Sequence, residues 1–345
     1  GGLSMDTPLL EVRDLMVQFP SAHGWLTVVD QVSFDVGRID IVCVFGESGS
    51  GKSVTLQAAV GLVQPKVGRV VSGSVRFAGQ ELIGMTNRQL NRIRGNQIGF
   101  IFQEPMTSLN PAYTVGDQIA EVVRRHRGVS RRDAWKRAIE VLDRVHIAAA
   151  ASRASDYPHQ FSGGMRQRVM IAMAIACDPK LLIADEPTTA LDVTIQARIL
   201  QVLEELQRES GMSVLFITHD LGVVAEVARS VVVMYGAQVV ENAPVNALFA
   251  NPRHPYTSGL LEAMPQVALD RGHAPVAIPG VVAQAHAWPA GCRFHPRCGF
   301  CVPAVCADQP VPLVADDHGM VRCARSGDLR TVLGQAAVER SVSAA

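Results

Sequence analysis

Apolar side chains recur along the chain in two patterns, and these patterns predict a series of strands and helices. Residues 9–19 and 27–36 alternate apolar and polar side chains, as strands of a half-exposed sheet do. Residues 39–45 are almost wholly apolar, which is typical of a buried strand. The remaining predicted elements are strands at 98–102, 181–185 and 213–218, and helices at 52–62, 162–177 and 194–209.

The order of these elements predicts the fold class. Because strands alternate with helices, we expect an α/β fold with a mainly parallel sheet covered on both faces. Residues 106–178 are expected to form a helical insertion into that sheet, since 114–151 is helical and charged without a strand signal. After about residue 245, Pro, Ala and His become more frequent and the periodicity weakens. We therefore expect one domain at 5–245 and a C-terminal extension at 246–345.

Composition narrows the class of protein. Hydrophobic residues make up 48% of the chain and charged residues 19%, and the formal net charge is zero. This is a globular composition, and the balanced charge argues against a nucleic-acid binder that relies on a basic face.

The longest apolar runs, at 169–177 and 231–240, reach about half of the roughly 20 residues that a membrane span needs. We expect no signal peptide, set residues 1–4 aside as a cloning remnant, and expect a cytosolic protein whose membrane role would come through partners.

Residues 46–53, with the sequence GESGSGKS, match the phosphate-loop pattern between a predicted buried strand and a predicted helix. Glycines allow the tight turn that points backbone N–H groups at phosphate oxygens, and the helix N-terminus adds positive potential. Lys52 would reach the β- and γ-phosphates, and Ser53 would coordinate Mg²⁺. The expected ATP-binding residues are Gly46, Ser48, Gly49, Ser50, Gly51, Lys52 and Ser53. The alternative is a flexible Gly/Ser turn without a ligand.

Two acidic residues close the predicted strand at 181–185. The strand would deliver Asp185 to Mg²⁺ at its C-terminal end, the region where open α/β sheets bind ligands. Glu186, the next residue, is placed to act as general base on the attacking water. The alternative is a strand that ends in two solvated acids, and the phosphate loop in the same chain argues against it.

A second helix start carries a serine and two glycines. Residues 161–167 read FSGGMRQ, which resembles the signature motif of ABC ATPases. Ser162, Gly163 and Gly164 would open a helix and form a second anion site, although such a cap is common without a ligand. In that family, the signature of one subunit caps the γ-phosphate of ATP on the phosphate loop of the other. The resemblance covers residues 9 to about 245.

The resemblance implies a P-loop NTPase fold of the ABC type, with a RecA-like parallel sheet core, an antiparallel β part and an inserted helical subdomain. Gln103 resembles the Q-loop glutamine, which contacts Mg²⁺ and the lytic water. His219 resembles the switch histidine that hydrogen-bonds the γ-phosphate, and Asp192 resembles the D-loop aspartate at the dimer interface. An aromatic residue near the first strand would stack on adenine, with Phe19 as the first choice and Trp25 as the second. The implied catalytic residues are Glu186, His219, Gln103 and Lys52.

Segments at 103–111, 188–194 and 254–257 resemble the oligopeptide/dipeptide importer subfamily, which also includes nickel and glutathione importers. This resemblance implies a peripheral ATPase subunit on the cytoplasmic face of the membrane that energises peptide import. The implied partners are a related, non-identical ATPase chain, two transmembrane permease subunits and, indirectly, an extracytoplasmic binding protein, with no nucleic acid. A nickel or glutathione importer is the alternative within the subfamily.

Two hypotheses from other classes compete with the importer. A soluble ABC ATPase acting on nucleic acid or ribosomes would usually carry tandem ATPase domains, coiled coils or basic linkers, and none is visible in the sequence. A non-catalytic interaction subunit would have a degenerate site, which the presence of Glu186, Gln103 and His219 argues against.

Five of the seven cysteines fall between residues 292 and 323. In a cytosolic chain such crowding indicates a metal or iron–sulfur site before a disulfide. It resembles the tail of the same subfamily, where four cysteines hold a [4Fe–4S] cluster. The resemblance assigns Cys292, Cys298, Cys306 and Cys323 as ligands and leaves Cys301 as the spare, although Cys298 and Cys301 could chelate as a pair. Structural zinc and a set of reduced, unligated thiols are the alternatives.

Overall fold

The computed structural model describes residues 7–22, 24–103, 108–187, 193–270, 274–330 and 332–333. Their contacts divide the chain into two compact units, each assembled from segments that are distant in sequence. The first unit takes the described residues of Gly1–Leu10, Val36–Ile41 and Arg76–Thr218. The second takes those of Glu11–Asp35, Val42–Val75 and His219–Ala345. The sequence boundary at residue 245 stays a prediction.

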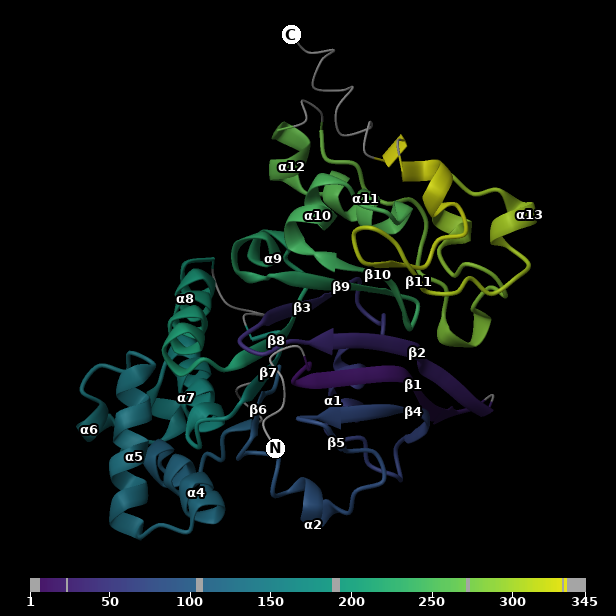
Figure 1. Cartoon of the computed structure of the whole chain (residues 1–345). Helices are drawn as coiled ribbons and strands as arrows, with labels where there is room; N and C mark the ends of the chain where they lie inside the picture. Colours follow the sequence, from purple (N-terminus) through teal and green to yellow (C-terminus); the bar gives the residue numbers. More distant parts are fainter. Residues whose placement is uncertain are drawn as a thin grey trace. The chain divides into compact units, whose positions relative to one another are not determined.

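A buried parallel sheet lies at the centre of the first unit (Figure 1). Its strands are β6 (Ile98–Ile101), β7 (Leu181–Asp185) and β8 (Ser213–Thr218), in the order β6-β7-β8. The middle strand, β7, pairs in parallel with both neighbours. Every residue of β7 and β8 is buried, which explains why both sequences are continuous apolar runs rather than alternating ones. The three strands confirm the sequence prediction.

Helices make up most of the rest of the first unit, and α4, α5 and α7 pack against one another (Figure 1). The hydroxyl of Thr114 accepts the N–H of Asp117 at the start of α4, and the hydroxyl of Ser130 accepts that of Asp133 at the start of α5. Besides β6, β7 and β8, the elements of this unit are β5 (Gln80–Glu81), α2 (Asn87–Leu90), α4 (Val115–Arg127), α5 (Arg131–Arg144), α6 (Ala150–Arg153), η1 (Pro158–Gln160), α7 (Gly163–Ile175) and α8 (Val193–Ser210).

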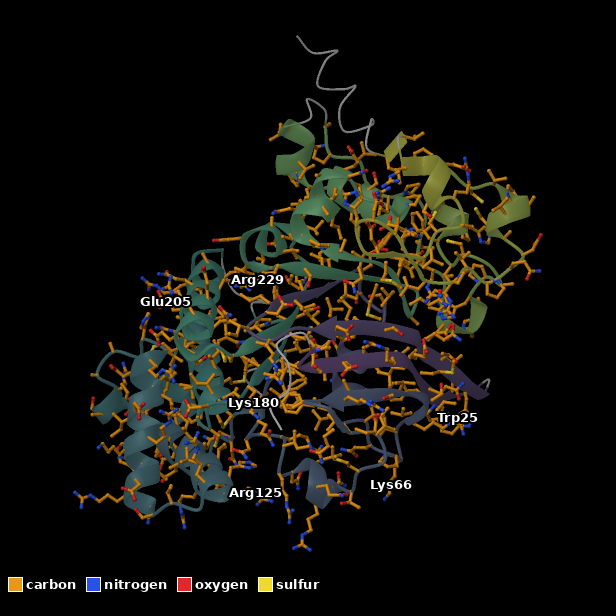
Figure 2. The ribbon with its side chains drawn as sticks, in the orientation of Figure 1. Trp25, Lys66, Arg125, Lys180, Glu205 and Arg229 are labelled. Atoms are coloured by element: carbon orange, nitrogen blue, oxygen red, sulfur yellow. The ribbon has the colours of Figure 1, made fainter. Side chains whose placement is uncertain are left out.

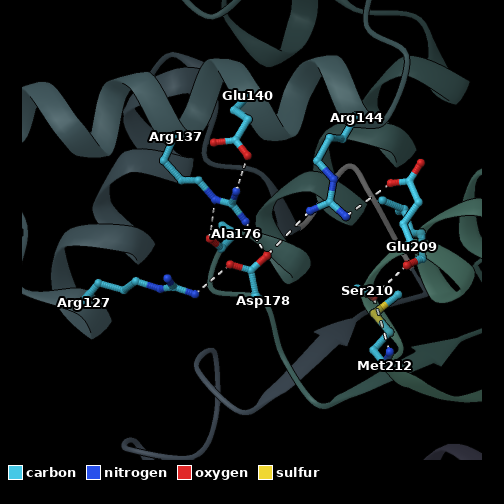
Figure 3. A network of polar contacts seen from close by, with 10 residues as sticks. Arg127, Arg137, Glu140, Arg144, Ala176, Asp178, Glu209, Ser210 and Met212 are labelled. Atoms are coloured by element: carbon cyan, nitrogen blue, oxygen red, sulfur yellow. Dashed lines mark hydrogen bonds and ion pairs between the residues drawn. The ribbon is translucent and has the colours of Figure 1, made fainter. Parts of the chain in front are cut away.

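An ion-pair network ties the end of α7 to α4 and α5 (Figure 3). Asp178, just beyond α7, accepts from Arg127 of α4 at 2.8 Å and from Arg137 of α5 at 2.6 Å. Arg144 approaches the same carboxylate at 3.6 Å, and Arg137 also donates to the carbonyl oxygen of Ala176 at 3.0 Å. Single exposed ion pairs contribute little, but a shared carboxylate with several partners forms a network. The network therefore fixes the C-terminal end of the helix that begins at Gly163.

The second unit contains strands from both ends of the chain. β3 (Ile41–Phe45) pairs in parallel with β9 (Ser230–Tyr235), and β9 pairs antiparallel with β10 (Gln238–Pro244). β10 also pairs antiparallel with β12 (Met320–Val321), so the C-terminal region extends this sheet. The other strands are β11 (Val314–Ala315), which pairs with β12, and β1 (Leu10–Ser21), β2 (Gly24–Val36) and β4 (Arg69–Phe77), which lie in the order β2-β1-β4.

Short helices complete the second unit. They are α1 (Lys52–Ala59), α9 (Leu221–Val227), α10 (Val245–Ala250), α11 (Pro255–Glu262), α12 (Pro265–Asp270), η2 (Ala285–Ala287), η3 (His295–Arg297) and α13 (Pro303–Cys306). The predicted helix at 52–62 ends early because Gly61 adopts a left-handed φ of +67° and Leu62 donates back to the carbonyl oxygen of Gln57 at 2.8 Å. Across the described part of the chain, no helix combines the length and the apolar content that crossing a bilayer requires.

Candidate functional site

The phosphate loop follows β3 in the second unit, and two of its glycines fit only because they lack a Cβ. A Cβ on Gly46 would lie 2.1 Å from the carbonyl oxygen of Met234, and one on Gly51 would lie 2.5 Å from that of Val28. Their φ angles, +151° and +94°, are also ones that other residues rarely adopt. The loop backbone is therefore tightly seated against β9 and β2.

Lys52 begins α1 and is buried at the loop. Its ammonium donates to the carbonyl oxygens of Gly46 at 2.7 Å and Glu47 at 3.0 Å, and to the hydroxyl of Ser50 at 3.5 Å. Ser53 lies in the first turn of the same helix. A glycine turn, a lysine and a hydroxyl at a helix N-terminus form the donor set that binds a triphosphate with Mg²⁺, so these residues fit that ligand.

Three predicted residues come together in the first unit. Asp185 ends β7 and is buried. The side-chain amide of Gln103 donates to the carboxylate of Glu186 at 3.0 Å. Glu186 has a φ of +48°, and its backbone N–H donates to the carbonyl oxygen of Ile217 at 3.2 Å. A non-glycine residue in this conformation costs about 1–3 kcal/mol, and such strain is concentrated at functional sites.

The predicted signature opens α7. The hydroxyl of Ser162 accepts the N–H of Met165 at 3.4 Å, and Ser162 and Gly163 are both exposed. Gly164 is buried, and a Cβ there would lie 2.6 Å from a methyl group of Ile195 on α8. The glycine thus lets α7 pack closely on α8, while the start of the helix faces solvent in this unit.

Of two further predicted residues, His219 and Asp192, the structure describes only His219. His219 directly follows β8 and is exposed. Its neighbour Asp220 caps α9 by accepting the N–H of Gly222 at 2.8 Å. Asp192 lies outside the described residues, as do 104–107 and 188–191 of the segments that resemble the importer subfamily.

The two aromatic residues proposed to stack on adenine are in different environments. Phe19 is half-buried, and its ring packs so closely on Gly68 that a Cβ there would lie 2.4 Å away. Trp25 on β2, labelled in Figure 2, is 47% exposed. The guanidinium of Arg69 lies 3.9 Å above its ring. The adenine contact stays a prediction for either residue.

Residues 29–189 match the family described as ABC transporter, and residues 240–306 match the one described as oligopeptide/dipeptide transporter, C-terminal region. A protein of Brucella melitensis named as a peptide import ATP-binding protein is 50% identical over 328 residues, which cover 92% of this chain and 97% of that protein. This chain belongs to the ABC transporter ATP-binding proteins.

Other proteins similar to this ABC ATPase point to the same family. A second B. melitensis protein named in the same way is 49% identical over 304 residues, covering 88% of this chain and 91% of that protein. A dimeric ATP-binding cassette bound to ADP and Pi has a TM-score of 0.61 and 27% identity, covering 68% of this chain and 98% of that chain. A subunit of an ABC transporter complex from Clostridium perfringens has a TM-score of 0.60 and 25% identity, covering 71% and 92%. The ABC-type P-loop fold and the ATPase class are thereby established.

The iron–sulfur prediction is wrong for this ABC ATPase. The four expected ligands, Cys292, Cys298, Cys306 and Cys323, do line one cavity, together with apolar side chains such as Phe294. Within the described ranges, however, no group of three or more His, Cys, Asp or Glu side chains is placed to hold a metal ion, and zinc has no site there either. Burial raises the pKa of Cys298 to about 11 and that of Cys323 to about 12, which favours neutral thiols in the absence of a metal.

One contact at the phosphate loop was missed by the sequence-based reasoning. The carboxylate of Glu47 accepts from Arg297 at 2.7 Å, and the backbone N–H of Glu47 donates to the hydroxyl of Tyr256 at 2.9 Å. Both partners lie in the C-terminal region, residues 246–345. The only available signals were that Tyr256 falls in a segment resembling the importer subfamily and that Arg297 stands beside a cysteine, and neither points to the loop.

Proposed function

We propose that this ABC ATPase hydrolyses Mg-ATP to energise the import of peptides across the cytoplasmic membrane through partner permease subunits. The observation that carries this proposal is the match of residues 240–306 to an oligopeptide/dipeptide transporter region in a chain that also holds a complete phosphate loop. The relatives named for peptide import, which align along nearly the whole chain, support it. In this account, 5–245 is the nucleotide-binding domain, with a helical subdomain at about 106–178, and 246–345 is an extension of it.

The phosphate loop binds the triphosphate in this account. Backbone N–H groups of the loop and the N-terminus of α1 face the phosphate oxygens, and Lys52 contacts the β- and γ-phosphates. Ser53, Asp185 and Gln103 are the residues that the family resemblance implies for Mg²⁺, which would neutralise charge on these phosphates. The buried position of Lys52 at the loop carbonyls supports its role, because its charge is already held at the loop.

Glu186 acts as the general base. A carboxylate that removes a proton from the attacking water makes the water a better nucleophile. The hydrogen bond from the amide of Gln103 orients this carboxylate. Lys52 and His219 stabilise the charge that develops on the γ-phosphate during transfer.

ATP hydrolysis in this account requires two ATPase subunits. The exposed start of α7 at Ser162, Gly163 and Gly164 would bind the γ-phosphate held by the opposing subunit, because a helix N-terminus attracts anions. Asp192 would act at the same interface. The solved dimeric cassette with ADP and Pi, which shares the fold, supports dimerisation. The partner ATPase is proposed to be a related chain, and closure of the pair would move two permease subunits.

Co-purification tests this function directly. The tagged chain, purified from native membranes in mild detergent, is expected to bring with it two multi-span permease subunits and to hydrolyse ATP. Recovery with ribosomes or nucleic acid, and without permeases, would instead favour a soluble ABC ATPase. We expect the chain to lie peripherally on the cytoplasmic face, attached through the permeases. It should therefore be released from membranes when the permeases are absent.

A further inference from the structure

The phosphate loop carries a carboxylate of its own. Glu47 follows Gly46 directly, so it places a negative charge in a loop that binds phosphates. Arg297 of the C-terminal region pairs with this carboxylate through two N–H···O bonds of 2.7 and 3.2 Å. Tyr256 of the same region accepts the backbone N–H of Glu47 at 2.9 Å. Both the charge and the backbone of this loop residue are therefore held by the C-terminal region.

Arg297 and Tyr256 are fixed by their surroundings. The side chain of Arg297 is only 6% exposed, and it donates to the carbonyl oxygen of Pro279 at 2.9 Å and to the hydroxyl of Tyr235 at 3.4 Å. Tyr235 and Tyr256 are buried with ring centroids 4.7 Å apart, and Phe294 packs on them at 5.2 and 5.3 Å. Side chains locked by packing position the groups they contact, so this aromatic cluster sets where Glu47 lies.

A second arginine of the same short segment reaches the loop indirectly. Arg293 donates to the carbonyl oxygen of Gly236 and to the carboxylate of Asp30. The next residue of that turn, Ala237, donates its N–H to the carbonyl oxygen of Ser50 in the phosphate loop at 3.2 Å. The segment containing Arg293 and Arg297 therefore contacts the loop at one end and the turn that supports it at the other.

We propose that Arg297 and Tyr256 are positioning residues for ATP binding, through which the C-terminal region sets the nucleotide affinity of the phosphate loop. This inference rests on the proposed function, since it takes the loop as the ATP site. Arg297 cancels the charge of Glu47, which would otherwise repel the triphosphate, and Tyr256 holds the loop backbone in place. If the ion pair only fastened the C-terminal region, its loss would change stability and leave nucleotide affinity unaltered.

Titration with a fluorescent ATP analogue in the presence of Mg²⁺ tests the proposal. We expect Arg297→Gln to weaken binding by about tenfold, because Glu47 then stands unpaired beside the phosphates. The double variant Arg297→Gln/Glu47→Gln is expected to recover most of the affinity, since the repelling charge is gone. Salt at about 1 M should narrow the deficit of the single variant, because salt screens repulsion between charges.

Arg253→Gln is the matched control. Arg253 is as deeply buried in the same region, with 4% of its side chain exposed, but it pairs with Asp317 at 2.8 Å and not with the loop. This variant is expected to bind the analogue like the wild type even if its thermal midpoint falls. Tyr256→Phe, which removes the acceptor for the Glu47 N–H, should weaken binding while the Arg297 pair remains intact.

The outcomes separate this proposal from the proposed function. Wild-type affinity in Arg297→Gln, or a double variant as weak as the single one, would overturn the positioning role. If Arg297→Gln does not fold, Tyr256→Phe decides: weaker binding of the analogue than by Arg253→Gln supports the positioning role, and wild-type affinity overturns it. A wild-type chain that binds no analogue, or binds it as well after Lys52→Ala, would instead overturn the proposed ATP site.

Discussion

Two glycines of the phosphate loop form a matched pair for testing how tightly the loop is seated. Gly49 and Gly51 have φ angles of +79° and +94°, so an alanine at either position pays the cost of a left-handed backbone, about 1–2 kcal/mol. Their surroundings differ. A Cβ on Gly51 would lie 2.5 Å from the carbonyl oxygen of Val28, whereas one on Gly49 would have nothing within 4 Å.

The contact at Gly51 is with backbone, which cannot rotate away as a flexible side chain can. Either the loop or strand β2 must shift, and such overpacking typically costs about 1–3 kcal/mol more. We therefore expect Gly49→Ala to lower the free energy of unfolding by about 1–2 kcal/mol and Gly51→Ala by about 2–5 kcal/mol.

Urea unfolding followed by far-UV circular dichroism measures the difference. Wild type and both variants are compared for the midpoint of the same transition, and an unchanged slope shows that the compactness of the end states is the same. A Gly51→Ala midpoint equal to that of Gly49→Ala would refute the reasoning, because it would mean that the loop is not held against Val28 in solution.

Further predictions concern catalysis and pH. Glu186→Gln should keep ATP binding and lose turnover by about 100-fold or more, since no general base remains. Steady-state ATPase assays and nucleotide titration measure the two quantities. Near-normal turnover would show that Glu186 is not the general base. Burial raises the pKa of Glu241 to about 7, so protonation of this carboxylate stabilises the fold as pH falls. Burial lowers the pKa of His254 to about 3, so protonation of this histidine in the unfolded chain destabilises the fold over the same range. Glu241→Gln should therefore lose about 2 kcal/mol more stability than wild type between about pH 7 and about pH 5 in urea unfolding; equal losses would contradict the assignment.

Local patterns explain what could be predicted from the sequence. The buried strands β7 and β8 appear as continuous apolar runs, and the phosphate loop and the start of α7 appear as short glycine motifs. Each of these features depends on neighbours within a few residues. β4 and β10 were not assigned as strands, although the apolar run of 231–240 contains much of β9 and the start of β10.

Contacts between distant residues could not be predicted in the same way. Arg297 and Glu47 are 250 residues apart, and nothing in either local sequence identifies the other as its partner. The cysteines show that a visible sequence pattern does not by itself establish a site. Their crowding was visible in the sequence, but whether their side chains are arranged to hold a metal ion depends on the folding of the chain around them, and the described residues show no such arrangement.

Peptide uptake by reconstituted complexes tests the central claim most directly. The chain is assembled with its permease and ATPase partners in proteoliposomes, and accumulation of a labelled peptide is followed with and without ATP. The account predicts uptake that requires ATP and falls by about tenfold or more when this chain carries Glu186→Gln. Equal uptake by that variant, or ATP hydrolysis without any peptide accumulation, would contradict it.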